Sequence, residues 1–216
     1  MRRAVIFDLD GTLLNTLGDL TAAVNHALSA HGFPTHTEAQ VRTFVGDGVR
    51  ELIARACPPD TAEAVRQSVL EAYLPYYAAH NADRTAPYDG VLHLLDSLRA
   101  AGYRLAVVSN KHDAGVQALC ARFFGEYLDV VVGADGSRPL KPAPDGILYA
   151  LSRLGVAPEH AWYVGDSAVD VVTARAAGVR CVAVTWGFQD PVRLAAENPA
   201  LLAHTVHELK TALLKE

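Results

Sequence analysis

Short runs of apolar residues recur along the chain and predict buried strands. They occupy residues 4–7, 105–108, 129–132, 162–164 and 181–184, and each contains at least one valine. A near-continuous apolar run is typical of a strand that is covered on both faces, as in a parallel sheet. The pattern therefore predicts several strands of one buried sheet.

The segments between these runs show the period of amphipathic helices. In residues 91–102, apolar side chains stand at positions 91, 92, 94, 95 and 98, and the segment ends at a glycine, which is typical of a helix C-terminus. Residues 145–155 repeat this design. Strands that alternate with such helices predict an α/β fold with a Rossmann-like parallel sheet, which binds ligands at the carboxyl ends of its strands.

One region departs from this alternation. Between about Leu17 and His80, helical periods occupy residues 16–32, 49–56 and 62–80, and no run is typical of a strand. We predict a helical insert after the first strand, with a sharp turn at residues 57–60 and a return to the sheet near Pro87.

Composition limits the classes of partner. The 216 residues have room for one substantial core and a small second unit, and the net charge of −5 comes without long runs of either sign. A small-molecule partner is therefore favoured over nucleic acid or a membrane surface. Three scattered cysteines without a CxxC pair argue against a disulfide framework or a zinc ribbon. With no signal-peptide core after Met1 and no membrane-spanning run, we expect a cytoplasmic protein.

Polar residues stand where the predicted strands end. Asp8 and Asp10 follow the first strand and precede a Gly-Thr turn. Because the carboxyl ends of parallel strands lie at one edge of a sheet, we expect other polar residues to converge there. They are Ser109, Asn110 and Lys111 after the second strand, Asp166 and Asp170 after the fourth, and Lys141 in a proline-rich loop.

Several carboxylates at one edge need compensating charge. Two unit charges about 4 Å apart repel by roughly 4 kcal/mol at an effective dielectric constant near 20, so a cation or partial protonation is required. The candidate ligands are all oxygens, which favours Mg2+. The hydroxyl of Ser109, the amide of Asn110 and the charge of Lys141 are suitable donors for a phosphate group.

Four signatures in chain order now resemble a known family. They are Asp8-Leu9-Asp10-Gly11-Thr12-Leu13, Ser109-Asn110-Lys111, Lys141-Pro142-Ala143-Pro144, and Gly165-Asp166-Ser167 with Asp170. Together they resemble the haloacid dehalogenase superfamily, specifically its phosphatases with a small helical cap, and are most similar to phosphoglycolate phosphatases. The resemblance implies a phosphatase core of residues 1–14 and 81–216, and a helical cap of residues 15–80. Asn15-Thr16 and Asp89 depart from the usual pattern outside the catalytic positions.

The resemblance implies a magnesium-dependent phosphomonoester hydrolase that forms an aspartyl-phosphate. Asp8 would be the nucleophile, and Asp10 would protonate the leaving oxygen and then activate water. A carboxylate oxygen of Asp8, the backbone carbonyl of Asp10, and Asp166 would hold Mg2+. Asp170 would orient the Lys141 ammonium or a metal-bound water, or would merely pair with a neighbouring arginine.

The same resemblance assigns the substrate contacts. Ser109 and Lys141 would clamp the transferring phosphoryl group, beside Asn110 and Thr12. A substrate carboxylate would meet arginines of the cap, and the candidates there are Arg42, Arg50 and Arg55, although a solvated helix face explains them equally well. The aromatic residues Tyr73, Tyr76 and Tyr77 either line the cap or pack between its helices.

Several functions stay open on these residues. We expect 2-phosphoglycolate or a similar small phosphate as substrate, and a monomer or homodimer. An inorganic pyrophosphatase, a sugar-phosphate phosphatase or a phosphoglucomutase would use the same core. A haloacid dehalogenase would use Asp8 on carbon without a metal, and a phosphate-binding module would bind without turnover.

Overall fold

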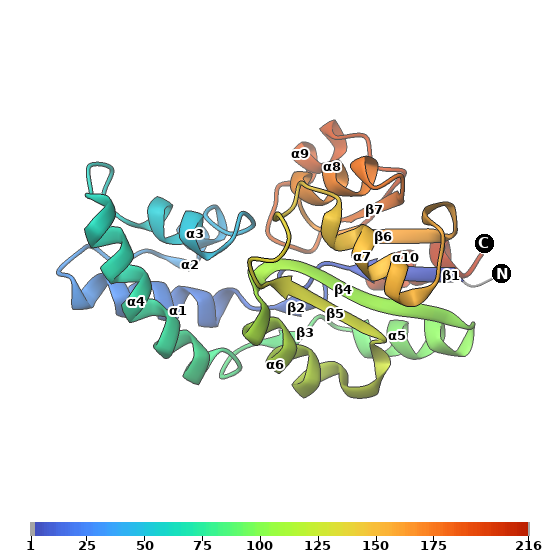
Figure 1. Ribbon diagram of the computed structural model, residues 1–216, viewed down its shortest axis with the longest axis horizontal. Helices are drawn as coiled ribbons and strands as arrows, with labels where there is room; N and C mark the ends of the chain where they lie inside the picture. Colours follow the sequence, from blue (N-terminus) through green and yellow to red (C-terminus); the bar gives the residue numbers. More distant parts are fainter. Residues whose placement is uncertain (1–2, 216) are drawn as a thin grey trace.

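The computed structural model describes residues 3–215 and contains one six-stranded parallel sheet (Figure 1). In spatial order, its strands are β5 (Val130–Ala134), β4 (Tyr103–His112), β1 (Arg3–Phe7), β6 (Ala161–Gly165), β7 (Arg180–Val184) and β8 (Leu201–Ala203). Every neighbouring pair in this sheet is parallel. The predicted α/β fold with a Rossmann-like parallel sheet is confirmed.

Helices cover both faces of this sheet. One face packs against α5 (Val91–Ala100), α6 (Asp113–Phe124) and α10 (Val206–Leu214), and the other against α7 (Asp145–Leu154), α8 (Ala168–Ala176) and α9 (Pro191–Ala196). In β1, Val5 and Phe7 face the first layer, whereas Ala4 and Ile6 face the second. This alternation explains why the strand is apolar at every position from Ala4 to Phe7. Single 3-10 turns, η1 (Gly125–Tyr127) and η2 (Pro158–His160), precede β5 and β6.

Four helices follow β1 and lie to one side of the sheet (Figure 1). They are α1 (Leu17–Ala30), α2 (Glu38–Arg42), α3 (Val49–Ala56) and α4 (Glu63–His80), and they share a hydrophobic cluster of their own. Three of them occupy the segments in which helices are expected. The short α2 is not predicted by the periodicity, because five residues span little more than one helical turn. We refer to α1–α4 as the helical insert.

The chain enters and leaves the insert through two paired segments. Here β2 (Leu14–Asn15) pairs antiparallel with β3 (Ala86–Pro87), so the chain near Pro87 does not return directly to the main sheet, contrary to our expectation. The buried carboxylate of Asp19 accepts hydrogen bonds from the backbone N–H groups of Arg84 and Thr85 and from the Thr85 hydroxyl. Asp19 therefore links the segment that enters the insert to the segment that leaves it. The division into a core and a cap at residues 14/15 and 80/81 stays a prediction.

The remaining sequence expectations concern cysteines and membranes. Cys57, Cys120 and Cys181 are buried free thiols, in agreement with the expected absence of a disulfide framework. Between residues 3 and 215, no helix combines the length and apolar character that crossing a membrane requires. Met1, Arg2 and Glu216, which belong to the predicted core, lie outside the described residues.

Candidate active site

The turn after β1 presents two carboxylates at the edge of the sheet. The N–H of Asp8 donates to the carbonyl of Val164 in β6 at 2.8 Å, which continues the pairing of the two strands to the site. Gly11 has φ +80°, and a Cβ there would lie 2.2 Å from Oδ2 of Asp166. Glycine is therefore required both by the backbone conformation and by the close approach of that carboxylate.

Lys141 lies at the centre of a buried group of charges. Its ammonium is 2.9 Å from Oδ1 of Asp8 and 2.7 Å from Oδ1 of Asp170, and it donates to the Tyr163 hydroxyl at 3.1 Å. Its side chain is only 4% exposed. Burial disfavours the ammonium, but the two adjacent carboxylates outweigh this effect and raise the pKa of Lys141 above its ordinary value. Lys141 is therefore held as a cation.

Asp170 is fixed by the start of α8. Ser167 is the N-cap of this helix, and its N–H and hydroxyl both donate to Oδ2 of Asp170 in a reciprocal capping box. Oδ1 of Asp170 faces Lys141 and the Tyr163 hydroxyl. A Cβ at Gly165 would lie 2.3 Å from Cγ of Asp170, so this close packing also depends on a glycine. Both oxygens of Asp170 are therefore already engaged.

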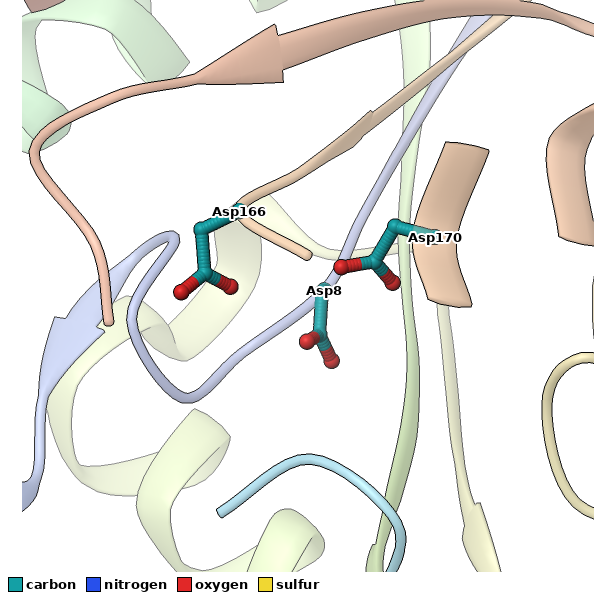
Figure 2. A group of neighbouring side chains, drawn as sticks. All are labelled: Asp8, Asp166 and Asp170. Carbon is teal, nitrogen blue, oxygen red and sulfur yellow. The ribbon is translucent and has the colours of Figure 1, made fainter. Parts of the chain in front are cut away.

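Three carboxylates surround a common space, as Figure 2 shows for Asp8, Asp166 and Asp170. One oxygen from each lies within 4.8 Å of the others. Burial, followed by the charge of Asp170, raises the pKa of Asp8 to about 6 despite the opposing Lys141. Burial, followed by the charges of Asp170 and Asp8, raises the pKa of Asp166 well above its ordinary value. The protein alone stabilises these anions poorly.

This donor set fits a hard divalent cation. One lysine ammonium compensates only part of the charge of three carboxylates, and among the described residues Oδ1 of Asp8 accepts no hydrogen bond, although the Lys141 ammonium lies 2.9 Å away. Asp166 is oriented by the Thr12 hydroxyl at 3.1 Å and by the N–H of Phe188 at 2.7 Å. Supported carboxylates with free lone pairs are typical ligands of such ions. The cluster could hold a metal ion.

The candidate phosphate donors have different positions. Ser109 lies at the cavity beside Asp8, and its Oγ accepts a hydrogen bond from the N–H of Lys111 at 3.3 Å. The Asn110 side chain instead exchanges hydrogen bonds with the backbone N–H and carbonyl of Lys141, at 2.8 and 3.0 Å. The Thr12 hydroxyl is engaged with Asp166. Asn110 and Thr12 thus hold neighbouring groups in place.

The arginines of the insert do not converge on the carboxylate cluster. Arg50 is exposed on α3 and donates to Gln67, and it is not among the residues that line the cavity. Arg55 forms an ion pair with Asp47. Arg42 lines the cavity, but its guanidinium donates to the carbonyls of Gly187 and Phe188.

A cavity of about 1220 Å³ joins the site to the helical insert. From the insert, its lining includes Leu20, Arg42, Leu52, Tyr73 and Tyr77, and from the end of the sheet it includes Asp8, Asp10, Ser109, Lys111, Lys141 and Asp166. Tyr73 and Tyr77 are stacked, with centroids 5.4 Å apart. These two aromatics therefore both pack in the insert and line the cavity.

The roles of two residues at the site, Tyr163 and Lys111, are not predicted from the sequence. Tyr163 supports Lys141 from β6, but a tyrosine in an apolar strand gives no signal of such a contact. Lys111 forms an ion pair with Asp10 at 3.0 Å. Its position two residues after Ser109 on an extended strand, where side chains alternate, is a signal that could have identified it.

Comparison with known proteins agrees with this geometry. Residues 5–184 match the family of haloacid dehalogenase-like hydrolases. Phosphoglycolate phosphatase 1 of Pseudomonas aeruginosa is 36% identical over 213 residues, which cover 96% of this chain and 78% of that protein. A phosphoglycolate phosphatase of Haemophilus influenzae is 34% identical, with 96% of each protein covered.

A solved structure shows the same fold over the whole chain. It is a protein of Lactobacillus delbrueckii subsp. bulgaricus, provisionally described as a phosphoglycolate phosphatase, with a TM-score of 0.95, 34% sequence identity and 100% of both chains covered. The resemblance on which the sequence interpretation rests is confirmed. The chain belongs to the haloacid dehalogenase-like hydrolase family.

Proposed function

We propose that this protein is a magnesium-dependent phosphatase that hydrolyses 2-phosphoglycolate or a similar small phosphomonoester through an aspartyl-phosphate. The observation that supports this most strongly is the ammonium of Lys141 between Asp8 and Asp170. It places a buried cation beside the proposed nucleophile, where the negative charge of a phosphoryl group would arrive. The names of the relatives support the substrate class.

The proposed reaction has two steps at phosphorus. A carboxylate oxygen of Asp8 attacks the phosphorus atom, the bond to the ester oxygen breaks, and Asp10 gives its proton to the departing alkoxide. Asp10 then removes a proton from water, whose oxygen attacks the phosphorus and releases inorganic phosphate from Asp8. Ser109 and Lys141 hold the non-bridging oxygens throughout, because both line the cavity next to Asp8.

The proposed ligands for Mg2+ are a carboxylate oxygen of Asp8, the backbone carbonyl of Asp10, and Asp166. When bound, the ion supplies positive charge against the anionic substrate and the carboxylates. Asp170 is proposed to act only through Lys141, because both of its oxygens already accept hydrogen bonds within the protein. Thr12 and Asn110 position Asp166 and the Lys141 loop, respectively, rather than substrate.

The helical insert is proposed to act as a cap that excludes bulk water from the reacting phosphoryl group. Its helices supply one wall of the cavity over the carboxylates. Exclusion of water strengthens the charge interactions within the site and limits side reactions. A cytoplasmic monomer or homodimer, with no nucleic-acid or membrane partner, remains part of this proposal.

Phosphate release from a substrate panel tests the proposal. The panel contains 2-phosphoglycolate, pyrophosphate, a hexose phosphate and a chromogenic phosphate ester, each with Mg2+ or with a chelator. We expect metal-dependent turnover that favours 2-phosphoglycolate and is lost in Asp8→Asn. Preference for pyrophosphate or a sugar phosphate would replace the substrate assignment and keep the mechanism, and a sugar-phosphate isomer as product would indicate a mutase.

Two further measurements separate the remaining alternatives. Halide release from a 2-haloacid that persists with a chelator would identify a dehalogenase. Phosphate affinity without turnover of any member would identify a binding module.

A further inference from the structure

The structure assigns a substrate contact to Lys111, a residue that the proposed reaction does not use. We infer that its ammonium binds the carboxylate of the leaving group, so that the site selects phosphate esters of small 2-hydroxy acids. This inference rests on the proposed function, because it concerns the part of the substrate that leaves with the ester oxygen.

Lys111 contacts both the turn after β1 and the helical insert. Its Nζ lies 3.0 Å from Oδ1 and 3.0 Å from Oδ2 of Asp10, and its side chain is only 8% exposed. The same atom lies 4.6 Å from the centre of the Tyr77 ring, which belongs to α4 of the insert. A buried ammonium against an aromatic face has little water around it and therefore interacts strongly with an added anion.

The other cations that line the cavity are either paired elsewhere or exposed. Lys141 is paired with Asp8 and Asp170 at the phosphoryl position. Arg42 gives its hydrogen bonds to main-chain carbonyls of residues 187 and 188. Arg193, which also lines the cavity, is exposed on α9. Among the side chains described, Lys111 is thus the buried cation adjacent to the general acid.

The chemistry of the substrate matches this position. In 2-phosphoglycolate one CH2 group separates the ester oxygen from the carboxylate. If Asp10 delivers its proton to the ester oxygen, a cation in contact with Asp10 lies within reach of a carboxylate so close to that oxygen. A substrate with a neutral leaving group offers Lys111 no such partner.

Tyr77, whose ring lies against the Lys111 ammonium, also lines the cavity. The Tyr77 hydroxyl is buried and makes no hydrogen bond within the described chain. The structure therefore offers the Lys111 ammonium, which lies against the Tyr77 ring, as the donor for the substrate carboxylate.

The test compares binding of two phosphonates by calorimetry in the presence of Mg2+. One is 3-phosphonopropionate, in which CH2 replaces the ester oxygen of 2-phosphoglycolate. The other is its carboxamide, in which an uncharged amide group replaces the carboxylate. Neither is hydrolysed, so the measurement does not depend on turnover. We expect wild-type protein to bind the acid more tightly than the amide by roughly 30-fold or more, as for a buried charged pair.

Variants assign this preference to a residue. Lys111→Met should abolish the preference for the acid, and Lys111→Arg should retain much of it. Lys210→Met, which removes a partly exposed lysine of α10 that does not line the cavity, is the matched control and should leave it unchanged. A preference that survives in Lys111→Met, or that wild-type protein lacks, overturns the inference.

Kinetics separate this inference from the proposed function. The ratio of kcat/KM for 2-phosphoglycolate to that for ethyl phosphate should fall at least 30-fold in Lys111→Met, mainly through KM. An equal loss on both substrates would mean that Lys111 serves Asp10 alone and would overturn the inference while the phosphatase stands. Loss of the proposed function would instead appear as no phosphate release from any ester by wild-type protein.

Discussion

Arg42, in the helical insert, donates a hydrogen bond of 2.6 Å to the carbonyl of Phe188 in the loop after β7. The N–H of Phe188 in turn donates to Oδ2 of Asp166 at 2.7 Å. The carbonyl of Gly187, which accepts a second hydrogen bond from Arg42, belongs to the same peptide unit as the Phe188 N–H, so the insert is linked through one peptide unit to a proposed metal ligand. Closure of the insert and the orientation of Asp166 are therefore expected to depend on each other.

This link predicts the effect of Arg42→Met. Without the guanidinium, the loop at residues 187–188 loses two hydrogen bonds from a charged donor, each worth about 1.5–3 kcal/mol when buried and less at this partly exposed position. We expect the Mg2+ concentration for half-maximal activity to rise several-fold, with little change in kcat at saturating Mg2+. Arg55→Met, which removes a surface ion pair of the same insert, is the control. An unchanged Mg2+ dependence would contradict the link.

Lys141→Met should destabilise the fold as well as abolish activity. The variant leaves Asp8 and Asp170 without their shared cation in a buried site. Removal of one partner from a buried ion pair typically costs about 3–5 kcal/mol. Urea unfolding in the presence of a chelator measures this loss, and Lys210→Met on the surface is the reference. A loss below about 1 kcal/mol would show that the charges are not coupled as described.

The metal-free protein should lose stability as the pH rises through the range in which Asp8 ionises. Burial raises the pKa of Asp8 from 3.8 to about 6, so the folded state binds this proton more tightly than the unfolded state. The resulting stability is fully present below about pH 4 and is lost as the pH rises through about 6, with an order of magnitude of about 3 kcal/mol.

Asp8→Asn tests this dependence, because it removes the ionisable group. In chelator, its urea unfolding should show a weaker loss of stability between about pH 4 and pH 6 than wild type. Mg2+ should stabilise wild-type protein more at pH 7 than at pH 5, since it binds the ionised carboxylates. Identical pH profiles for the variant and wild type would exclude Asp8 as the source.

Asp19→Ala should weaken the connection between the core and the insert. Its carboxylate accepts hydrogen bonds from the backbone of Arg84 and Thr85 and from the Thr85 hydroxyl, and the substitution leaves the donors of the buried Thr85 without this partner. Each such donor costs about 1–3 kcal/mol. Glu38→Ala is a matched control, because its half-exposed carboxylate forms one ion pair within the described chain, with the Arg84 side chain at 3.9 Å. Equal urea midpoints for the two variants would refute this role.

The sequence predicts the strands and the long helices because their periodicity is local. It also predicts which residues meet at the edge of the sheet, since parallel strands end together there. It does not predict β8, because Leu201–Ala203 contains no β-branched or aromatic side chain. The sequence likewise cannot assign partners to arginines on a helix surface, so the contacts of Arg42 and Arg50 emerge only from the tertiary structure.

The roles of some site residues cannot be predicted from the sequence because they depend on packing. Lys111 belongs to a quoted signature, yet its contact with Asp10 requires the register between β1 and β4. In contrast, the capping box of Ser167 and Asp170 is a local pattern, Ser-x-x-Asp, that predicts a helix N-terminus from the sequence alone. The start of α8 can therefore be predicted from local sequence, whereas the long-range ion pair between Lys111 and Asp10 cannot.

The most direct test of the central claim is identification of the phosphorylated residue. Wild-type protein is mixed with 2-phosphoglycolate and Mg2+, quenched in acid during turnover, and mapped by peptide mass spectrometry. We expect one phosphoryl group on Asp8 in wild-type protein, none with chelator, and none in Asp8→Asn. Turnover without any phosphorylated Asp8, or with the phosphoryl group on another residue, would contradict the account.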